Sequence, residues 1–298
     1  CGAVYEYHNG DRRRYGTVRM AGDIRSDEQN NAFNNLYAGG CGYFEGRTSH
    51  ETIYRIPSVK EASDMLTHGE GQNRTENDPA LCQRILFDII LAEGFRRAGN
   101  YVYRADCPDC KACIPIRIWP DVFEPSKSQR RVLEKNRDIA VTLTTKADEF
   151  VTGEKITLFR TYDKRHNPDS EKSFDEAKKT LIDMNGICCT AEDGKYESFY
   201  SGTINMDYRC GGKLVGVGII DTGEASLSSN YFYYDTSDET KKRSIGTYSI
   251  LREIELCRTF HLQRYYLGYW LKDCKSMVYK SNFKPHELLI DGEWKLIT

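Results

Sequence analysis

Three cysteines at regular spacing are the clearest chemical signal in the chain. Cys107, Cys110 and Cys113 form a C-x2-C-x2-C pattern within GFRRAGNYVYRADCPDCKACIPIR, residues 94–117. Thiolates are the soft ligands that zinc and iron–sulfur clusters take, so a single loop could hold one metal centre. A fourth ligand must come from elsewhere, and Cys41 in the glycine-rich GGCGYF is the candidate. The alternative is three thiols that hold no metal.

Two neighbouring arginines stand just before this loop. Arg96 and Arg97 follow the expected end of a helix at Gly94. A guanidinium can hold a carboxylate through two parallel hydrogen bonds, so the pair could bind an anionic ligand. The alternative is two ordinary solvated arginines at a helix end. His166, in the polar segment RTYDKRHNPDS (160–170), is either a base or an exposed loop side chain.

A surplus of positive charge lies at residues 125–137, where Glu134 is the single acid. The cations of this segment are Lys127, Arg130, Arg131, Lys135 and Arg137. Such a patch, with Ser126 and Ser128 as further donors, suits a phosphate backbone. The alternative is the solvated face of a helix.

The composition limits the class of protein. The chain has 298 residues, a formal net charge of −2 and 39% apolar residues, so it can form one large domain or two modest ones. It is not a globally basic nucleic-acid binder, and any RNA contact needs a local patch. The cysteines number 11, an odd count, and neither a secretory signal nor a membrane-length apolar run is visible. We therefore expect a cytoplasmic protein with no membrane segment.

The first half of the chain is expected to contain a polar extension, residues 1–38, and a cysteine-containing module, residues 39–122. Residues 52–56 alternate as a strand does. Asp78 and Pro79 predict the start of a helix that ends at Gly94. Residues 113–120 predict a further strand.

The second half, residues 123–298, is expected to form an α+β module. Ser173 and Glu176 make a capping box for a helix that runs to about residue 183. From residue 196 onward come several strands, a helix that starts near Ser244 and a buried strand at 261–270. This order is typical of the acetyltransferase-like (GNAT) core, in which a splayed central strand leaves room for an acyl donor. The loop RSIGTYS (243–249) has one glycine where a CoA-binding loop needs two, which argues against CoA as the donor.

Several motifs together resemble the aminoacyl-tRNA–protein transferase family. They are GFRRAGNYVYR, CPDCKAC, FEPSKSQRRVLEKN, SIGTYSILREIE and YYLGYWLKDCKSMVYKSNFKP, and the match covers about residues 39–295. The family includes arginyltransferases and bacterial aspartate/glutamate leucyltransferases. The resemblance implies a GNAT-like C-terminal module behind an N-terminal cysteine-rich, metal-binding module. It also implies transfer of an amino acid from aminoacyl-tRNA to acceptor proteins with N-terminal Asp or Glu, which creates a degradation signal.

The resemblance also implies a metal ligand set. The cysteines at the matching positions are Cys41, Cys107, Cys110 and Cys113. Phe44 stands where the eukaryotic arginyltransferases have a second cysteine, and the compact triplet is more similar to the bacterial leucyl branch. The metal is zinc or an iron–sulfur cluster, and the triplet favours the cluster slightly.

The transfer chemistry implied needs little more than positioning. An aminoacyl ester is already activated, so the enzyme must align amine and ester, polarise the carbonyl and move one proton. We expect Asp235 or Glu253 to take the amine proton. Tyr269, Tyr279 and Lys280 are expected to orient the reactants or to stabilise the oxyanion or leaving group. The alternatives are a core aromatic for Tyr269 and a solvated helix position for Glu253.

Substrate contacts follow from charge and ring chemistry. The acidic side chain of the acceptor needs a cation, for which Arg96 and Arg97 are candidates. The candidates for tRNA phosphates are Lys127, Arg130, Arg131 and Lys275. Trp270 or Tyr269 is expected to stack on the terminal adenine.

The identity of the transferred amino acid is left open between two choices. Leucine needs an apolar pocket, which the residues at 227–234 and 265–271 permit. Arginine needs a buried acid, which Asp221, Glu224, Asp235 or Glu253 permits. The bacterial-like motifs favour leucine.

Two other classes of protein remain. The first is a metal-dependent RNA-binding or redox-sensing protein, but this class does not account for a GNAT-like half. The second is a CoA-dependent N-acetyltransferase, but this class conflicts with the missing glycine.

Overall fold

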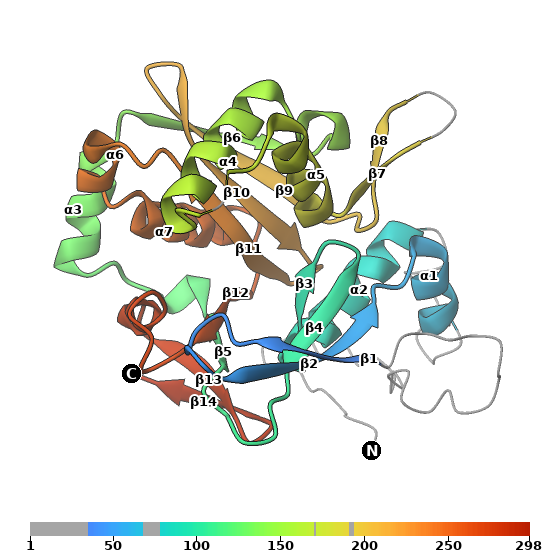
Figure 1. Cartoon of the computed structure of the whole chain (residues 1–298). Helices are drawn as coiled ribbons and strands as arrows, with labels where there is room; N and C mark the ends of the chain where they lie inside the picture. The colour runs from blue at the N-terminus through green and yellow to red at the C-terminus, as the bar shows by residue number, and fades with distance from the viewer. Residues whose placement is uncertain (1–34, 68–77, 170, 191–193) are drawn as a thin grey trace.

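The computed structural model describes residues 35–67, 78–169, 171–190 and 194–298 (Figure 1). Apart from residues 35–38, the predicted polar extension lies outside the described residues. The described part is a mixed α+β fold with a small and a large sheet, which confirms the predicted class. No helix among these residues has the length and apolar character that crossing a membrane requires.

The small sheet and two helices form the N-terminal part. Its strands are β1 (Asn35–Gly40), β2 (Thr48–Arg55), β3 (Arg96–Ala98) and β4 (Tyr101–Ala105), in the antiparallel order β1-β2-β4-β3. Helix α1 (Val59–Thr67) precedes α2 (Pro79–Ala92). As predicted, Asp78 caps α2, because its side chain accepts a hydrogen bond from the backbone of Leu81 at 2.9 Å. Leu86, Phe87 and Ile90 of α2 pack into a buried cluster with Val102 of the sheet.

The large sheet has eight strands in the order β14-β13-β5-β12-β11-β10-β9-β6. In chain order the strands are β5 (Ile114–Ile118), β6 (Ile139–Thr144), β9 (Thr203–Cys210), β10 (Lys213–Thr222), β11 (Ser226–Tyr234), β12 (Arg264–Trp270), β13 (His286–Ile290) and β14 (Glu293–Ile297). Strand β5 directly follows the cysteine loop, yet it pairs with β12 and β13. The cysteine loop is therefore anchored at one end to the small sheet and at the other to the large one.

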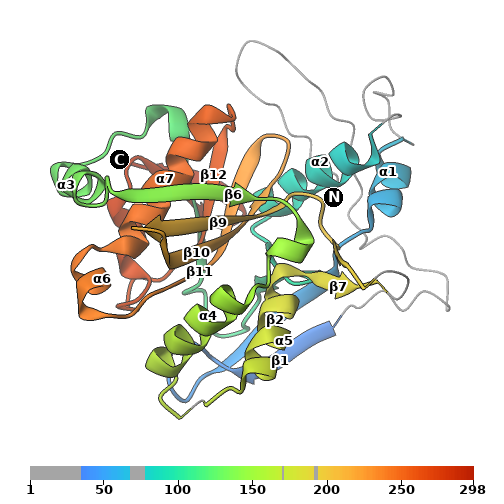
Figure 2. The same cartoon turned by 90° about the horizontal axis from the view of Figure 1, so that it is seen from above.

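Helices cover both faces of the large sheet (Figure 2). Helices α3 (Lys127–Lys135) and α7 (Ile245–Thr259) lie on one side and share a core with Ile116, Met206 and Ile220. Helices α4 (Gly153–His166) and α5 (Phe174–Asn185) lie on the other side, over Leu214 and Val217. The shorter elements are α6 (Asp238–Lys242), the 3-10 turns η2 (Pro120–Val122), η3 (Ala147–Glu149) and η4 (Val278–Asn282), and the hairpin β7 (Ile187–Cys189) and β8 (Tyr196–Ser198).

Two of the predicted helices have the expected boundaries. The Ser173–Glu176 capping box starts α5, and α7 begins at Ile245, next to the predicted start at Ser244. The loop expected at 160–170 is wrong for its first part, because α4 continues through His166 and ends there. The His166 ring packs on that of Tyr162 one turn earlier, with 4.1 Å between the ring centres, a contact that stabilises the last turn of a helix.

Candidate active site

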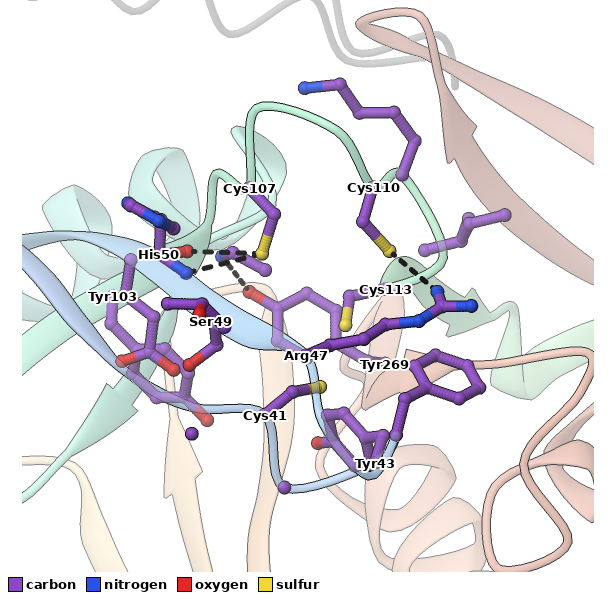
Figure 3. A pocket seen from close by; sticks show the side chains of 18 of the residues that line it. Cys41, Tyr43, Arg47, Ser49, His50, Tyr103, Cys107, Cys110, Cys113 and Tyr269 are labelled. Atoms are coloured by element: carbon purple, nitrogen blue, oxygen red, sulfur yellow. Dashed lines mark hydrogen bonds between the residues drawn. The ribbon is translucent and has the colours of Figure 1, made fainter.

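The four predicted cysteine ligands line one pocket of about 660 Å³ (Figure 3). Cys41 comes from the loop after β1, and Cys107, Cys110 and Cys113 come from the loop between β4 and β5. These loops meet because β2 pairs with β4 and carries β1 on its other edge. The sequence predicted that Cys41 would lie near Cys107, Cys110 and Cys113 although they are far apart along the chain.

The thiols of this pocket are close enough to act on one another. Burial first, and then the charges of Cys107, Cys41 and Cys110, raise the pKa of Cys113 to about 12. The Sγ of Cys107 accepts a hydrogen bond from the backbone N–H of His50 at 3.3 Å. Backbone N–H donors of this kind stabilise a thiolate, the form that binds a metal.

The donor set fits a soft metal by its chemistry. Four thiols that face one pocket are the ligands of a structural zinc site or an iron–sulfur cluster. As placed, no group of three or more His, Cys, Asp or Glu within the described ranges could hold a metal ion. Binding would therefore require the loops to draw the thiols together.

A second feature lies beside this pocket, where β11 and β12 diverge. The two parallel strands pair only at Ser226–Arg264, Leu227–Tyr265 and Ser228–Tyr266. Beyond these pairs β11 continues to Tyr234 beside β10, and β12 continues to Trp270 beside β5, but the two strands no longer pair with each other. We call this divergence, from Ser229 on β11 and Leu267 on β12, the wedge. It lies where the sequence predicted a splayed strand.

Arg96 fills the vertex of the wedge. Its Nη2 donates to the carbonyl oxygen of Ser229 at 2.7 Å and to that of Asn230 at 3.3 Å. Opposite, Gly268 has a φ of 82°, and a Cβ there would overlap the Arg96 guanidinium. Only glycine therefore permits this approach. The buried Nε of Arg96 has no hydrogen-bond partner among the described residues.

Glu253 of α7 lies on the β11 side of the wedge. It is 1% exposed, and its Oε2 accepts a hydrogen bond from the hydroxyl of Tyr265 at 2.8 Å. The Ser229 side chain is a second partner. Burial raises the pKa of Glu253 to about 7, so this carboxyl titrates near neutral pH. The alternative of a solvated helix residue is wrong.

Lys280 of η4 lies on the β12 side. Its Nζ donates to the backbone oxygen of Tyr269 at 2.9 Å, and the residue is 7% exposed. Burial, and then the charge of Arg96, lower the pKa of Lys280 to about 7. A lysine that is partly neutral at physiological pH can accept a proton.

Tyr269 connects the wedge to the cysteine pocket. It belongs to β12, is 2% exposed and lines the pocket. Its hydroxyl accepts a hydrogen bond from the backbone N–H of Ala105 at 3.0 Å, at the start of the cysteine loop. The Arg96 guanidinium lies 5.8 Å from the centre of its ring. The position of the loop and that of the wedge are therefore coupled through one side chain.

Two predicted site residues are placed elsewhere. Arg97 is fully buried in an ion pair with Asp221, with N–O distances of 2.6 and 2.8 Å, which argues against a role in acceptor binding. Asp235 lies past the end of β11, where Lys213 donates to it at 2.7 Å and the backbone of Ser237 at 3.0 Å. These partners give Asp235 a structural role at the start of α6 and argue against proton transfer.

Three of the four predicted phosphate contacts lie on an exposed helix next to the wedge. Lys127, Arg130 and Arg131 belong to α3 and are exposed, and so is Lys275. Gln129 of α3 donates to the backbone oxygen of Asn282 in η4 at 3.3 Å. Trp270 is half-buried, and its Nε1 donates to the Val278 oxygen at 3.3 Å. The indole therefore supports η4, which carries Tyr279 and Lys280.

Three residues of this region were not predicted. Gly268 permits the approach of Arg96, and Tyr265 holds Glu253 by a hydrogen bond. Ser229 contacts both Arg96, through its backbone oxygen, and Glu253, through its side chain. The glycine between Leu267 and Tyr269, in a strand of large residues, was a signal of close backbone approach. The roles of Ser229 and Tyr265 depend on pairing across the sheet, which no local pattern reveals.

Comparison with known proteins identifies relatives over both parts of the chain. Two family profiles match: Arginine-tRNA-protein transferase, N terminus, at residues 39–131, and Arginine-tRNA-protein transferase, C terminus, at residues 154–290. The chain is 34% identical to the aspartate/glutamate leucyltransferase of Saccharophagus degradans, over 70% of this chain and 82% of that protein. It is 32% identical to the enzyme of that name from Aeromonas hydrophila, over 84% of this chain and 98% of that protein.

Solved structures with a similar arrangement are more distant. A crystal structure of FemX has a TM-score of 0.40 at 9% identity, over 85% of this chain and 86% of that chain. A GCN5-related glucosamine N-acetyltransferase region of a fungal multi-domain enzyme has a TM-score of 0.35 at 10% identity, over 72% of this chain and 22% of that chain. The assignment rests on the sequence relatives. The chain belongs to the arginine-tRNA-protein transferase family.

Proposed function

We propose that this protein transfers leucine from leucyl-tRNA to the N-terminal amine of proteins that begin with Asp or Glu. Its relatives that carry the name aspartate/glutamate leucyltransferase support this activity. The wedge is the single structural observation that carries it, because Glu253 and Lys280, which both titrate near pH 7, flank the diverging strands there. On this reading the C-terminal part is a GNAT-like module, and the wedge receives the aminoacyl end of the tRNA.

The reaction forms an amide bond and breaks an ester bond. The neutral α-amine of the acceptor attacks the ester carbonyl, and the tetrahedral intermediate then expels the ribose hydroxyl. Lys280, with a pKa of about 7, accepts the proton that the amine loses and returns one to the departing ribose oxygen. Glu253 lies on the β11 side of the wedge, where Tyr265 and Ser229 hold it by hydrogen bonds. It places a second ionisable group, with a pKa of about 7, beside the reactants.

The acidic side chain of the acceptor requires a cation, and Arg96 is the available one. Its guanidinium donates to backbone oxygens, and its Nε has no hydrogen-bond partner among the described residues. A carboxylate would gain a charge-assisted, bidentate contact there. Arg97 cannot take this role, because Asp221 already satisfies it.

The cysteines would hold zinc or an iron–sulfur cluster. When bound, such a centre supplies a crosslink between the loop of Cys41 and the loop of Cys107, Cys110 and Cys113. The chain's own contribution is the hydrogen bond from Ala105 to Tyr269, through which a fixed loop would hold β12 in place. We include a cytoplasmic location in the proposal, since leucyl-tRNA is made there.

The test is a transfer assay with two donors and three acceptors. Radiolabelled leucyl-tRNA or arginyl-tRNA is incubated with the protein and with reporters that begin with Asp, Glu or Ala. We expect label only from leucyl-tRNA and only on the Asp and Glu reporters. Label from arginyl-tRNA alone would replace leucine by arginine as the donor. An absence of label from both tRNAs, with the metal content verified, would refute the proposal.

A further inference from the structure

A group of aromatic side chains lies at the unpaired edge of β11 and takes no part in the chemistry proposed above. We call it the aromatic ledge, and three elements supply it. Its members are Tyr162 and His166 of α4, Tyr231 and Tyr234 of β11, and Tyr279 of η4.

Tyr162 contacts three other rings of the ledge. The Tyr162 ring centre lies 5.2 Å from that of Tyr234, 6.2 Å from that of Tyr231 and 4.1 Å from that of His166. Tyr279 is close enough to Tyr162 and Tyr234 to interact electrostatically with both. The cluster therefore extends from α4 to β11, and Tyr279 of η4 lies near it.

Part of the ledge remains open to solvent. Tyr279 is 37% exposed, His166 is exposed, and Tyr162, Tyr231 and Tyr234 are half-buried. A cluster whose purpose is core packing would be covered, as the neighbouring Tyr233 and Phe159 are at 0% and 1% exposure. Large, partly exposed rings at a strand edge form a surface on which a planar ligand can stack.

The surroundings indicate which planar ligand fits. Beyond Ser228 the edge of β11 that faces β12 has no strand partner, and Arg96 takes only the carbonyl groups of Ser229 and Asn230. Helix α3, which carries the exposed cations, contacts η4, the element that carries Tyr279. The contact is a hydrogen bond from Gln129 of α3 to the backbone oxygen of Asn282 in η4. A cationic helix beside an aromatic platform is the arrangement that binds single-stranded nucleic acid.

We propose that the aromatic ledge stacks the terminal adenine of the tRNA while α3 contacts the phosphates behind it. This inference rests on the proposed function and deepens it. It replaces Trp270 and Tyr269 as the expected stacking partners, since the Trp270 indole supports η4 and Tyr269 is 2% exposed. The other possible occupant is the leucyl side chain of the donor, and the experiment below separates the two.

The test uses uncharged tRNA that carries the fluorescent base 2-aminopurine in place of its terminal adenine. Stacking on aromatic rings quenches this base, so binding to the full-length protein is expected to lower its fluorescence without any attached leucine. Tyr234→Leu and Tyr279→Leu each keep bulk but remove the ring. We expect each to abolish most of the quenching and to weaken binding about tenfold.

Two kinds of control give the result its meaning. Tyr279→Phe keeps the ring and loses only the hydroxyl, so quenching should persist even if the transfer rate changes. Tyr101→Leu makes the same exchange at a similarly exposed tyrosine of β4, at 39% exposure, and should change nothing.

Three outcomes would overturn the inference. The first is quenching that appears only when leucine is attached to the tRNA, and the second is tRNA binding without quenching. The third is full quenching in Tyr234→Leu and Tyr279→Leu. In each of these the protein still binds tRNA and the proposed transfer can stand. If the unmodified protein bound no tRNA at all, the proposed function would fail together with the ledge.

Discussion

At the scale of single residues, burial sets the protonation of the two groups that flank the wedge. The folded-state pKa of Glu253, about 7, is above its usual value of 4.5. The folded protein therefore holds this proton more tightly than the unfolded chain, and the resulting stability is lost as the pH rises through about 7.

Glu253→Gln tests this pKa. The amide keeps an acceptor for Tyr265 but cannot ionise. We expect the variant to match the parent near pH ~5 and to exceed its unfolding free energy by about 1–3 kcal/mol near pH ~8. Urea denaturation at both pH values measures the difference. An equal difference at both would contradict a raised pKa.

Lys280→Met tests the proton acceptor. Methionine fills a similar buried volume but has no amine, so we expect kcat for leucine transfer to fall about 10²–10⁴-fold. The parent's kcat should rise with pH through about 7, as Lys280 loses its proton, and the variant's should lose this step. Lys272→Met, at an exposed lysine of the same segment, is the control. A variant with unchanged kcat would remove Lys280 from the mechanism.

The arginine pair shows what the sequence can and cannot predict at this scale. Neighbouring residues of a strand point to opposite faces, so Arg96 and Arg97 must diverge. The sequence does not say which faces the wedge, because that depends on the register of β3 against β4, with Arg96 opposite Tyr103. Four of the five predicted catalytic residues do lie around the wedge or its rim, and Asp235 does not.

At the scale of elements, local capping signals predicted the helices well. Asp78 and Ser173 fix the starts of α2 and α5 with side-chain hydrogen bonds that the sequence makes evident. The wedge could be expected only by fold analogy, because β11 and β12 are joined by a long crossover and their pairing length is set by packing. The participation of β5 in the large sheet was not predicted at all.

Helix α3 is the element that we expect to carry the tRNA backbone. Its capping box, Ser126 with Gln129, holds it in place and is left intact by Arg130→Ala with Arg131→Ala. This double variant should weaken leucyl-tRNA binding and reduce the slope of log affinity against log salt by about 2. Titration at several salt concentrations measures both. Lys178→Ala with Lys179→Ala on α5 is the matched control, and an equal loss there would indicate a general charge effect.

The cysteine loop is the element that we expect to hold the metal. Cys110→Ser removes one of four thiolates, so metal content per chain should fall, because the remaining ligands bind it more weakly. Elemental analysis after purification measures this directly. Cys210→Ser, on β9, should retain the full content. Equal metal content in both variants would contradict the assigned ligand set.

At the scale of the whole molecule, the two sheets are joined by buried polar contacts. Asp88 of α2 accepts hydrogen bonds from Ser226 and Ala225 at the start of β11, and Gln83 bonds the backbone of Ser201 and Phe199. The fully buried ion pair is a further link, between Arg97 of β3 and Asp221 of β10, and Thr203 and Asn230 also contact this aspartate. The same β3 places Arg96 in the wedge, so this link aligns the small sheet with the site.

Asp221→Ala should therefore affect stability and activity together. It leaves the Arg97 charge buried without a counter-ion, which typically costs about 3–5 kcal/mol, against about 0–1 kcal/mol for Glu154→Ala at the partly exposed Arg209 pair. Denaturation measures both losses. Arg97→Met combined with Asp221→Leu removes both charges and should recover much of the stability, yet not the transfer rate if Arg96 has shifted. Recovery of both would show that the pair contributes stability alone and does not align the site.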